Sequence, residues 1–231
     1  MAAQQPPGLL IPRPITQGRA FAESLAPGAW TPILAPLMRI VPATAPPDLA
    51  GVTHLIFTSR NGVEAAAATI AHRLPAICVG AQTTERAKAL GFAATQAGAT
   101  AADLAQRLTP EPDRRLLHLH GAHVSGDLAG SLRAAGHHCD SRVIYDQHAR
   151  PLPGPVLTDL AGGTLADVVL FSPRSADLFA KQTHGFGVAP GCRLYCLSDA
   201  VADRARAVAG AALRVAARPD ATAMRTLLQR A

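Results

Sequence analysis

The 231-residue chain has no apolar run long enough to span a membrane. Its longest apolar segments, such as residues 209–217, fall well short of the ~20 residues that a spanning helix needs. The sequence does not open with a basic segment followed by an apolar stretch, so a secretory signal is not expected. We therefore expect a cytoplasmic protein that does not associate with membranes.

Aromatic residues and lysine are both scarce. Aromatics make up 4% of the chain, and only Lys88 and Lys181 accompany 20 arginines within a net charge of +6. The basic residues form no run, and few aromatics are present to stack on bases, so nucleic acid is not an expected partner. Arginine holds a carboxylate or phosphate through two parallel hydrogen bonds, so a small polyanionic ligand fits the charge. A codon bias toward arginine is an equally simple explanation of the excess of arginine over lysine.

Several common site motifs are missing. No GxGxxG, Walker loop, GxSxG or HExxH pattern is present, which removes the usual support for nucleotide-binding, hydrolase and zincin interpretations. CxxxC at Cys192 and Cys196 has no second pair to complete a zinc site. The four cysteines are Cys78, Cys139, Cys192 and Cys196. We expect them to be packed thiols.

The segment HLHGAH raises the alternative of a metal site. His118 and His120 share one face of an expected strand, and His123 follows in the turn. No nearby carboxylate or cysteine completes the ligand set, so packed or solvated histidines are the favoured interpretation and no metal is expected.

What the chain does have is a regular alternation of short β-type runs and amphipathic helical patterns. Its hydrophobic fraction is 48% and its mean hydropathy is +0.15, which suits a globular protein. Strand, helix and strand at this spacing predict parallel α/β units. The expected strands cover residues 8–12, 31–36, 37–42, 53–59, 75–80, 116–121, 138–148, 167–172, 192–198 and 212–217.

Two places break the alternation and predict domain boundaries. Between residues 31 and 42, two β-type runs follow each other without a helix, and residues 148–155 (HARPLPGP) suit a linker. Two junctions in one chain imply an insertion. We predict an outer α/β domain of residues 1–37 plus 150–231 and an inserted α/β domain of residues 38–149.

An internal repeat supports this division. FTSRNGVEA pairs with FSPRSADLF, CVGAQTTERAKALG with CLSDAVADRARAVAG, and ATAADLAQRL with ATAMRTLLQR, in the same order. Three ordered matches predict two copies of one structure. The expected fold is two similar, flavodoxin-like α/β domains with parallel sheets.

Hydroxyl residues follow several of the expected strands. Ser59 and Ser172 stand where a strand gives way to a helix, with Pro173 in the favoured first helical position, and Thr83 begins another helix. Ligands of open parallel sheets bind at the carboxyl ends of the strands, where helix N-termini attract anions. Helix capping alone is the alternative for each serine.

The ordered set LIPRP, IFTSRNGVEA, VGAQTTERAKALG, VIYDQ, LFSPRSADLF and ATAMRTLLQ resembles the uroporphyrinogen-III synthase family over almost the whole chain. The resemblance implies two α/β domains joined by a two-stranded linker, with the active site in the cleft between them. It implies an enzyme that acts on hydroxymethylbilane, inverts ring D and closes the macrocycle to uroporphyrinogen III without a metal or an organic cofactor. We expect it to act as a monomer.

The resemblance also assigns roles by position. Tyr145 matches a tyrosine thought to assist loss of the substrate hydroxyl as water; packing in the strand is the alternative. The expected substrate-binding residues are Arg13, Ser59, Thr83, Ser172 and Ser198. The chain departs from the family at residues 198–201, where the family often has G-P-T-T-A, so Ser198 is the only hydroxyl left in that turn.

Two other classes of function remain open on the residues alone. A non-catalytic two-domain protein that closes around a small polycarboxylate predicts the same architecture. A two-domain glycosyltransferase is usually much longer and carries a nucleotide-sugar motif, which is not visible here. Fold analogy alone does not decide among them.

Overall fold

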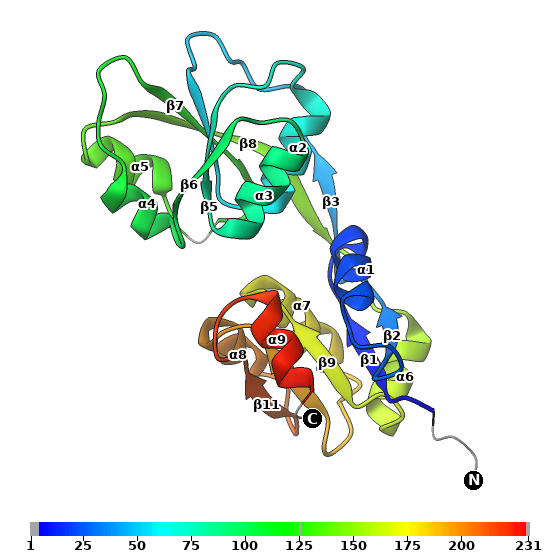
Figure 1. Cartoon of the computed structure of the whole chain (residues 1–231). Coiled ribbons are helices and arrows are strands. Elements are labelled where there is room, and N and C mark those ends of the chain that lie inside the picture. Colours follow the sequence, from blue (N-terminus) through cyan, green and yellow to red (C-terminus); the bar gives the residue numbers. More distant parts are fainter. Residues whose placement is uncertain (1–4, 125, 230–231) are drawn as a thin grey trace. The chain divides into compact units, whose positions relative to one another are not determined.

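Two separate parallel-dominated sheets form the core of the computed structural model, which describes residues 5–124 and 126–229 (Figure 1). The strands of the five-stranded sheet are β1 (Gly8–Ile11), β2 (Thr31–Leu34), β9 (Asp167–Leu170), β10 (Arg193–Cys196) and β11 (Ala212–Val215). The strands of the six-stranded sheet are β3 (Met38–Pro42), β4 (His54–Phe57), β5 (Ala76–Val79), β6 (Ala94–Gly98), β7 (Arg115–Gly121) and β8 (His138–Ala149). The helices are α1 (Ile15–Glu23), α2 (Arg60–Thr69), α3 (Ala81–Ala89), α4 (Ala101–Arg107), α5 (Leu128–Ala134), α6 (Gly154–Gly162), α7 (Pro173–Thr183), α8 (Asp199–Ala205) and α9 (Ala221–Leu228).

The chain divides into two units, one inserted in the other. Unit 1 comprises Met1–Arg39 and His148–Ala231, and unit 2 comprises Ile40–Gln147. β3 and β8 are neighbours in the six-stranded sheet, and each contains one of the two boundaries. The predicted two-stranded linker is therefore confirmed. The predicted domain ranges, 1–37 plus 150–231 and 38–149, stay a prediction.

The sheet of unit 1 is covered by helices on both faces. Its strands lie in the order β11-β10-β9-β1-β2, and all adjacent pairs are parallel. Leu10 and Val168 belong to the core formed with α6, α7 and α8, whereas Leu9 and Ile11 face the core formed with α1 and α9. Successive side chains of a strand point to opposite faces, so the short apolar run of β1 fills both cores.

The sheet of unit 2 is also covered by helices on both faces. Its order is β3-β8-β7-β4-β5-β6, and the adjacent pairs from β8 to β6 are parallel. Leu55 and Phe57 of β4 pack with α2 and α3, while Ile56 between them packs with α4 and α5. Such two-sided burial explains why the strands read as continuous apolar runs.

The internal repeat is confirmed by strand order. When β4, β5 and β6 are matched with β9, β10 and β11, the remaining strands β7 and β8 correspond to β1 and β2. In chain order unit 1 has the flavodoxin arrangement 2-1-3-4-5, and unit 2 has the same spatial arrangement with the chain entering at a different strand. One sequence match needs correction, because FTSRNGVEA against FSPRSADLF aligns Ser59 with Pro173, whereas the two structural caps are Ser59 and Ser172.

β6 was not among the predicted strands. Its sequence, ATQAG, has no branched or aromatic apolar residue. Within the described residues it lies at the sheet edge and pairs with β5 alone. Its last residue packs closely against the start of α4, where a Cβ on Gly98 would lie 2.7 Å from the Cβ of Asp103. Close packing of the backbone replaces apolar side chains in this strand.

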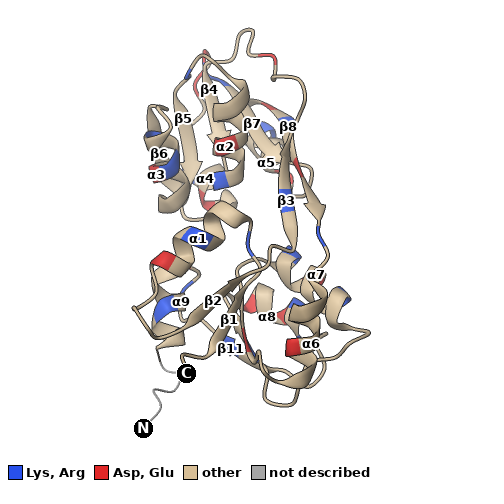
Figure 2. Cartoon of the chain, turned by 90° about the vertical axis from the view of Figure 1, so that its right-hand side faces the viewer, with Lys and Arg blue, Asp and Glu red and all other residues tan. Residues whose placement is uncertain are grey.

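Charge is dispersed over the molecule. Figure 2 shows Lys and Arg on several helices and strands of both units, with Asp and Glu among them. In the part of the chain that the structure describes, no helix has the length and apolar character needed to cross a membrane.

Candidate active site

The predicted site residues of unit 1 lie at one edge of its sheet. Arg13 follows β1, Ser172 follows β9, and Ser198 follows β10. These strands are parallel, so their carboxyl ends meet at the same edge. Strand order reverses between β1 and β9, which is where open parallel sheets bind ligands.

The predicted site residues of unit 2 are arranged in the same way. Ser59 follows β4, Thr83 lies in the first turn of α3 after β5, and Tyr145 lies on β8 opposite Gly121, the last residue of β7. Here the strand order reverses between β4 and β7. Each unit therefore gathers three of the six predicted residues at its carboxyl edge.

Ser59 joins a helix cap to the predicted catalytic tyrosine. It has extended backbone geometry, and its Oγ accepts a hydrogen bond from the Gly62 amide at 3.1 Å, which caps α2. The same Oγ lies 3.1 Å from the Tyr145 hydroxyl, and either hydroxyl can donate in that bond. Capping and tyrosine contact thus occur together at one side chain.

The Tyr145 ring lies against a glycine. An added Cβ at Gly121 would lie 2.6 Å from the Cε2 and Cζ atoms of the ring, so only glycine leaves room for it. The side chain is 4% exposed and contributes to the core of unit 2. The Tyr145 ring therefore packs in the core, as the packing alternative predicts, and its hydroxyl is within hydrogen-bond distance of Ser59.

Thr83 carries a hydroxyl that has no partner within the described residues. The residue is buried in the first turn of α3, behind Gly80, whose φ of 76° requires glycine. The neighbouring Thr84 donates instead to the Gly80 carbonyl at 3.0 Å. This turn therefore leaves one hydroxyl of the pair available to a ligand.

The equivalent cap of unit 1 is Ser172. Its Oγ accepts from the Ser175 amide at 3.1 Å and lies 2.8 Å from the Ser175 Oγ, so the start of α7 is capped and followed by Pro173 as predicted. Ser198 precedes α8 without a side-chain capping bond, and its hydroxyl has no partner within the described residues. The carboxylate of Asp199 stands in the first turn beside it.

Arg13 is held over an aromatic ring. Its guanidinium carbon lies 3.9 Å from the ring centroid of Phe171, and its Nη2 donates to Gln17 Oε1 at 3.1 Å. Phe171 in turn meets Phe21 edge to face, with ring centroids 4.8 Å apart. These contacts restrict the guanidinium plane at the point where the strand order of unit 1 reverses.

The histidine segment has a structural explanation. His118 is 4% exposed, its Nε2 lies 3.3 Å from Thr58 Oγ1, and its ring centroid lies 4.7 Å from that of His120. Burial lowers the pKa of His118 to about 4, helped by His120 and opposed by Asp127. His118 is therefore neutral at physiological pH and packs as part of β7.

The remaining histidine of the segment points elsewhere. The Nε2 of His123 lies 3.7 Å from Asp146 Oδ1, and both side chains are about half exposed. Among residues 5–124 and 126–229, no group of three or more His, Cys, Asp or Glu side chains is arranged to hold a metal ion.

The cysteines are buried thiols, as predicted from their spacing. All four are free and buried, and burial raises the pKa of each thiol to about 11; they are Cys78, Cys139, Cys192 and Cys196. At physiological pH they are protonated and pack as small apolar groups.

The contacts of two supporting residues were not predicted from the sequence. Phe171 directly precedes Ser172 in the repeat, and Gly121 ends an apolar run, so both were visible as strand-end residues. Their contacts with Arg13 and Tyr145 depend on which strands are neighbours.

Fold and site together define a class: a protein of two repeated parallel α/β units, with hydroxyl, arginine and tyrosine side chains at the strand ends where ligands bind. The model of the family described as "Uroporphyrinogen-III synthase HemD" matches residues 19–225. The chain belongs to the uroporphyrinogen-III synthase family. It is a cyclising lyase of heme biosynthesis, which converts hydroxymethylbilane to uroporphyrinogen III by dehydration, inversion of ring D and macrocycle closure.

Solved structures of synthases share the fold. The uroporphyrinogen-III synthetase of Helicobacter pylori has a TM-score of 0.68 at 15% identity, over 97% of this chain and 99% of that chain. A mutant uroporphyrinogen III synthase of the extremely thermophilic bacterium Thermus thermophilus has a TM-score of 0.55 at 15% identity, over 97% of this chain and 100% of that chain. None of the curated proteins matches the chain in sequence.

Proposed function

We propose that the carboxyl edges of both sheets bind the substrate, and that Tyr145 assists the loss of its hydroxyl group. The observation that carries this proposal is the position of the six predicted residues, three at the carboxyl edge of each unit. Hydroxymethylbilane carries acetate and propionate side chains. These anions are suited to the arginine, the free hydroxyls and the helix N-termini found at such edges.

The residues divide into two groups by what they already contact. Ser59 and Ser172 cap their own helices and hold the strand-to-helix turns in place. Thr83 and Ser198 have hydroxyls without a partner in the described part of the chain, so they are available to donate to a carboxylate. Arg13 supplies the positive charge.

Loss of water from the substrate needs only modest help from an acid. When the hydroxymethyl C–O bond of the substrate breaks, the oxygen takes a proton and leaves as water, and the pyrrole nitrogen lone pair stabilises the azafulvene that remains. The hydrogen bond between Tyr145 and Ser59 supports a role of the tyrosine hydroxyl in that proton transfer. The enzyme then has to hold the tetrapyrrole so that ring D is attacked at its substituted carbon, which yields a spiro intermediate that reopens with the ring inverted.

The isomer of the product tests the function. The protein is given freshly generated hydroxymethylbilane, the products are oxidised, and uroporphyrins I and III are separated by chromatography. Predominant isomer III supports catalysis with ring inversion. Isomer I alone, at the spontaneous rate, overturns it and favours a non-catalytic polycarboxylate-binding protein.

Two finer properties belong to the same proposal. We propose that the enzyme acts as a monomer in the cytoplasm, where a reducing environment keeps thiols such as the four buried cysteines free. Light scattering during size-exclusion chromatography tests the first property, and a dimer mass at working concentration contradicts it. Cell fractionation tests the second.

A further inference from the structure

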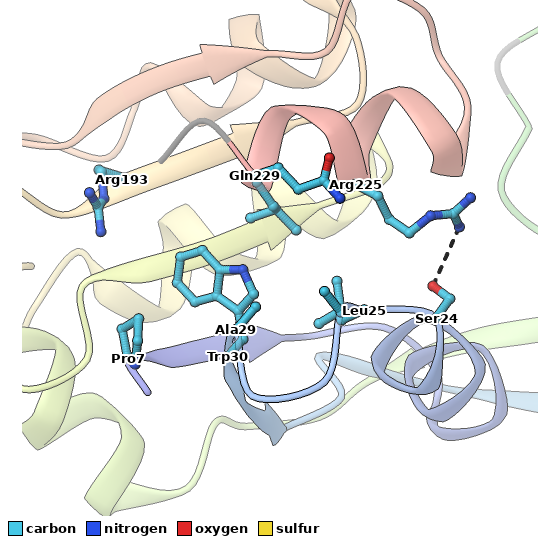
Figure 3. Close-up of a pocket in the computed structure, with 10 residues that line it drawn as sticks. Pro7, Ser24, Leu25, Ala29, Trp30, Arg193, Arg225 and Gln229 are labelled. Atoms are coloured by element: carbon cyan, nitrogen blue, oxygen red, sulfur yellow. Dashed lines mark hydrogen bonds between the residues drawn. The ribbon is translucent and has the colours of Figure 1, made fainter. Parts of the chain in front are cut away.

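A cavity of about 530 Å³ lies at the other edge of the unit 1 sheet (Figure 3). Pro7 precedes β1, Trp30 precedes β2 and Arg193 begins β10, so these lining residues mark the amino ends of three parallel strands. Arg13 and Ser198 lie at the opposite, carboxyl ends. The cavity is therefore separate from the strand ends proposed to bind substrate, and its volume suits a small molecule.

One wall of the cavity carries the guanidinium of Arg225. The Nη2 of Arg225 donates to Thr222 Oγ1 at 2.9 Å. Its Nη1 donates to Ser24 Oγ at 3.4 Å, the bond that is dashed in Figure 3. Within the described residues Arg225 forms no ion pair with a carboxylate. A guanidinium has five N–H donors, so several remain for a ligand.

The other donors of the cavity point to the same chemistry. Arg193 is already paired with Asp167 through two hydrogen bonds of 2.6 and 2.7 Å, but it retains further N–H groups. The indole N–H of Trp30 has no acceptor within the described residues. Of the lining residues that the structure describes, none is an aspartate or a glutamate. The polar lining consists mainly of donors, which favours an anion.

The anion must also have an apolar part. α1 and α9 end beside the cavity, and helix C-termini carry partial negative charge, which reduces the attraction for a bare anion. The Trp30 ring, Leu25 and Leu228 supply an apolar wall to offset this. We propose that the cavity is a binding site for a small aromatic carboxylate, with its ring on this apolar wall and its carboxylate on Arg225.

Trp30 is the only tryptophan of the chain and lines the cavity, so its fluorescence can report on binding there. The probes are benzoate and the uncharged benzyl alcohol, titrated into the full chain. We expect saturable quenching by benzoate and at least fivefold weaker binding of benzyl alcohol. Equal binding of the two probes, or no saturable change with benzoate, overturns the proposal.

Two variants locate the carboxylate. Arg225→Gln should weaken benzoate binding about tenfold, as expected for loss of a charge-assisted hydrogen bond. Arg218→Gln is the matched control, because this arginine is 75% exposed and lies outside the cavity. Circular dichroism checks that both variants fold. Unchanged affinity in Arg225→Gln, or an equal loss in Arg218→Gln, refutes the assignment, and neither result depends on the synthase activity.

Discussion

The Tyr145 hydroxyl lies 3.1 Å from the Ser59 Oγ, although the two residues are 86 positions apart in the chain. The contact joins β8, at the residue opposite the last residue of β7, to the cap of α2 across the point where the strand order of unit 2 reverses. Three features meet there: a helix N-terminus, a buried aromatic ring and a hydroxyl that can exchange a proton. This arrangement makes the role of Tyr145 testable without disturbing the fold.

Tyr145→Phe keeps the ring and removes only the hydroxyl. We expect kcat for uroporphyrinogen III formation to fall about tenfold, less than the ~10²–10⁴-fold typical of an obligatory general acid, because the azafulvene forms readily. The measurement is the initial rate of isomer III formation, with the Tm recorded alongside. Unchanged kinetics would remove the proton-transfer role from Tyr145.

Gly121→Ala tests whether the position of the Tyr145 ring matters for catalysis. The added Cβ would overlap the Tyr145 ring, so the ring must move and its bond to Ser59 is lost. We expect kcat to fall at least as much as in Tyr145→Phe. Gly126→Ala is the control, since a Cβ there meets nothing within 4 Å. A Gly121→Ala enzyme of normal rate would show that the position of the ring is unimportant.

Phe171→Leu tests whether the ring under Arg13 orients it for substrate. Loss of the cation–π contact, worth ~0.5–1 kcal/mol at a partly exposed site, should raise KM about threefold to fivefold and leave kcat unchanged. The control is Phe186→Leu, at a side chain that is 62% exposed. A fall in kcat with constant KM would mean that Phe171 serves another purpose.

Much of the fold was predictable because two-sided burial leaves a plain signal. The runs around β1, β4 and β9 are continuously apolar, and the serines after β4 and β9 mark the helix starts. β6 was not predictable from its residues, because ATQAG carries neither apolar alternation nor branched apolar side chains. Only its pairing with β5 makes it a strand.

The strand-end positions of the candidate site residues were predictable, but their contacts were not. Ser59 and Ser172 were identified as strand-end residues from local sequence alone. The partners Tyr145 of Ser59 and Phe171 of Arg13 come from strands that are neighbours only in three dimensions. A single sequence does not show the order of the strands in the sheet. Helix capping can be predicted without that order, because it acts over three residues.

Asp167 illustrates a stabilising network that the sequence does not reveal. Its carboxylate is 2% exposed and accepts two hydrogen bonds from Arg193 and one of 2.9 Å from Tyr195. Asp167→Asn should lower the free energy of unfolding of unit 1 by about 2 kcal/mol, because the buried carboxylate loses its charge-assisted hydrogen bonds with Arg193, whose own side chain is 36% exposed and can be solvated. Urea unfolding followed by Trp30 fluorescence measures this unit, since Trp30 packs edge-on to Tyr195.

A surface ion pair is the comparison for that result. Asp203 pairs with Arg206, and both side chains are at least 65% exposed. Asp203→Asn should change stability by less than ~0.5 kcal/mol. Equal effects of Asp167→Asn and Asp203→Asn would mean that burial of the Asp167 network contributes little.

His118 should make the stability of unit 2 sensitive to acid. Burial lowers its pKa from the ordinary 6.5 to about 4, so between these values the unfolded chain binds a proton that the folded chain does not. Stability is therefore full above about pH 6.5 and falls as the pH decreases toward 4. Urea unfolding followed by circular dichroism from pH 7.5 to 4.5 measures the slope. His118→Gln should flatten it, while His72→Gln, at an exposed histidine, should retain the wild-type slope. Identical slopes in all three proteins would show that His118 takes up its proton without opening the fold.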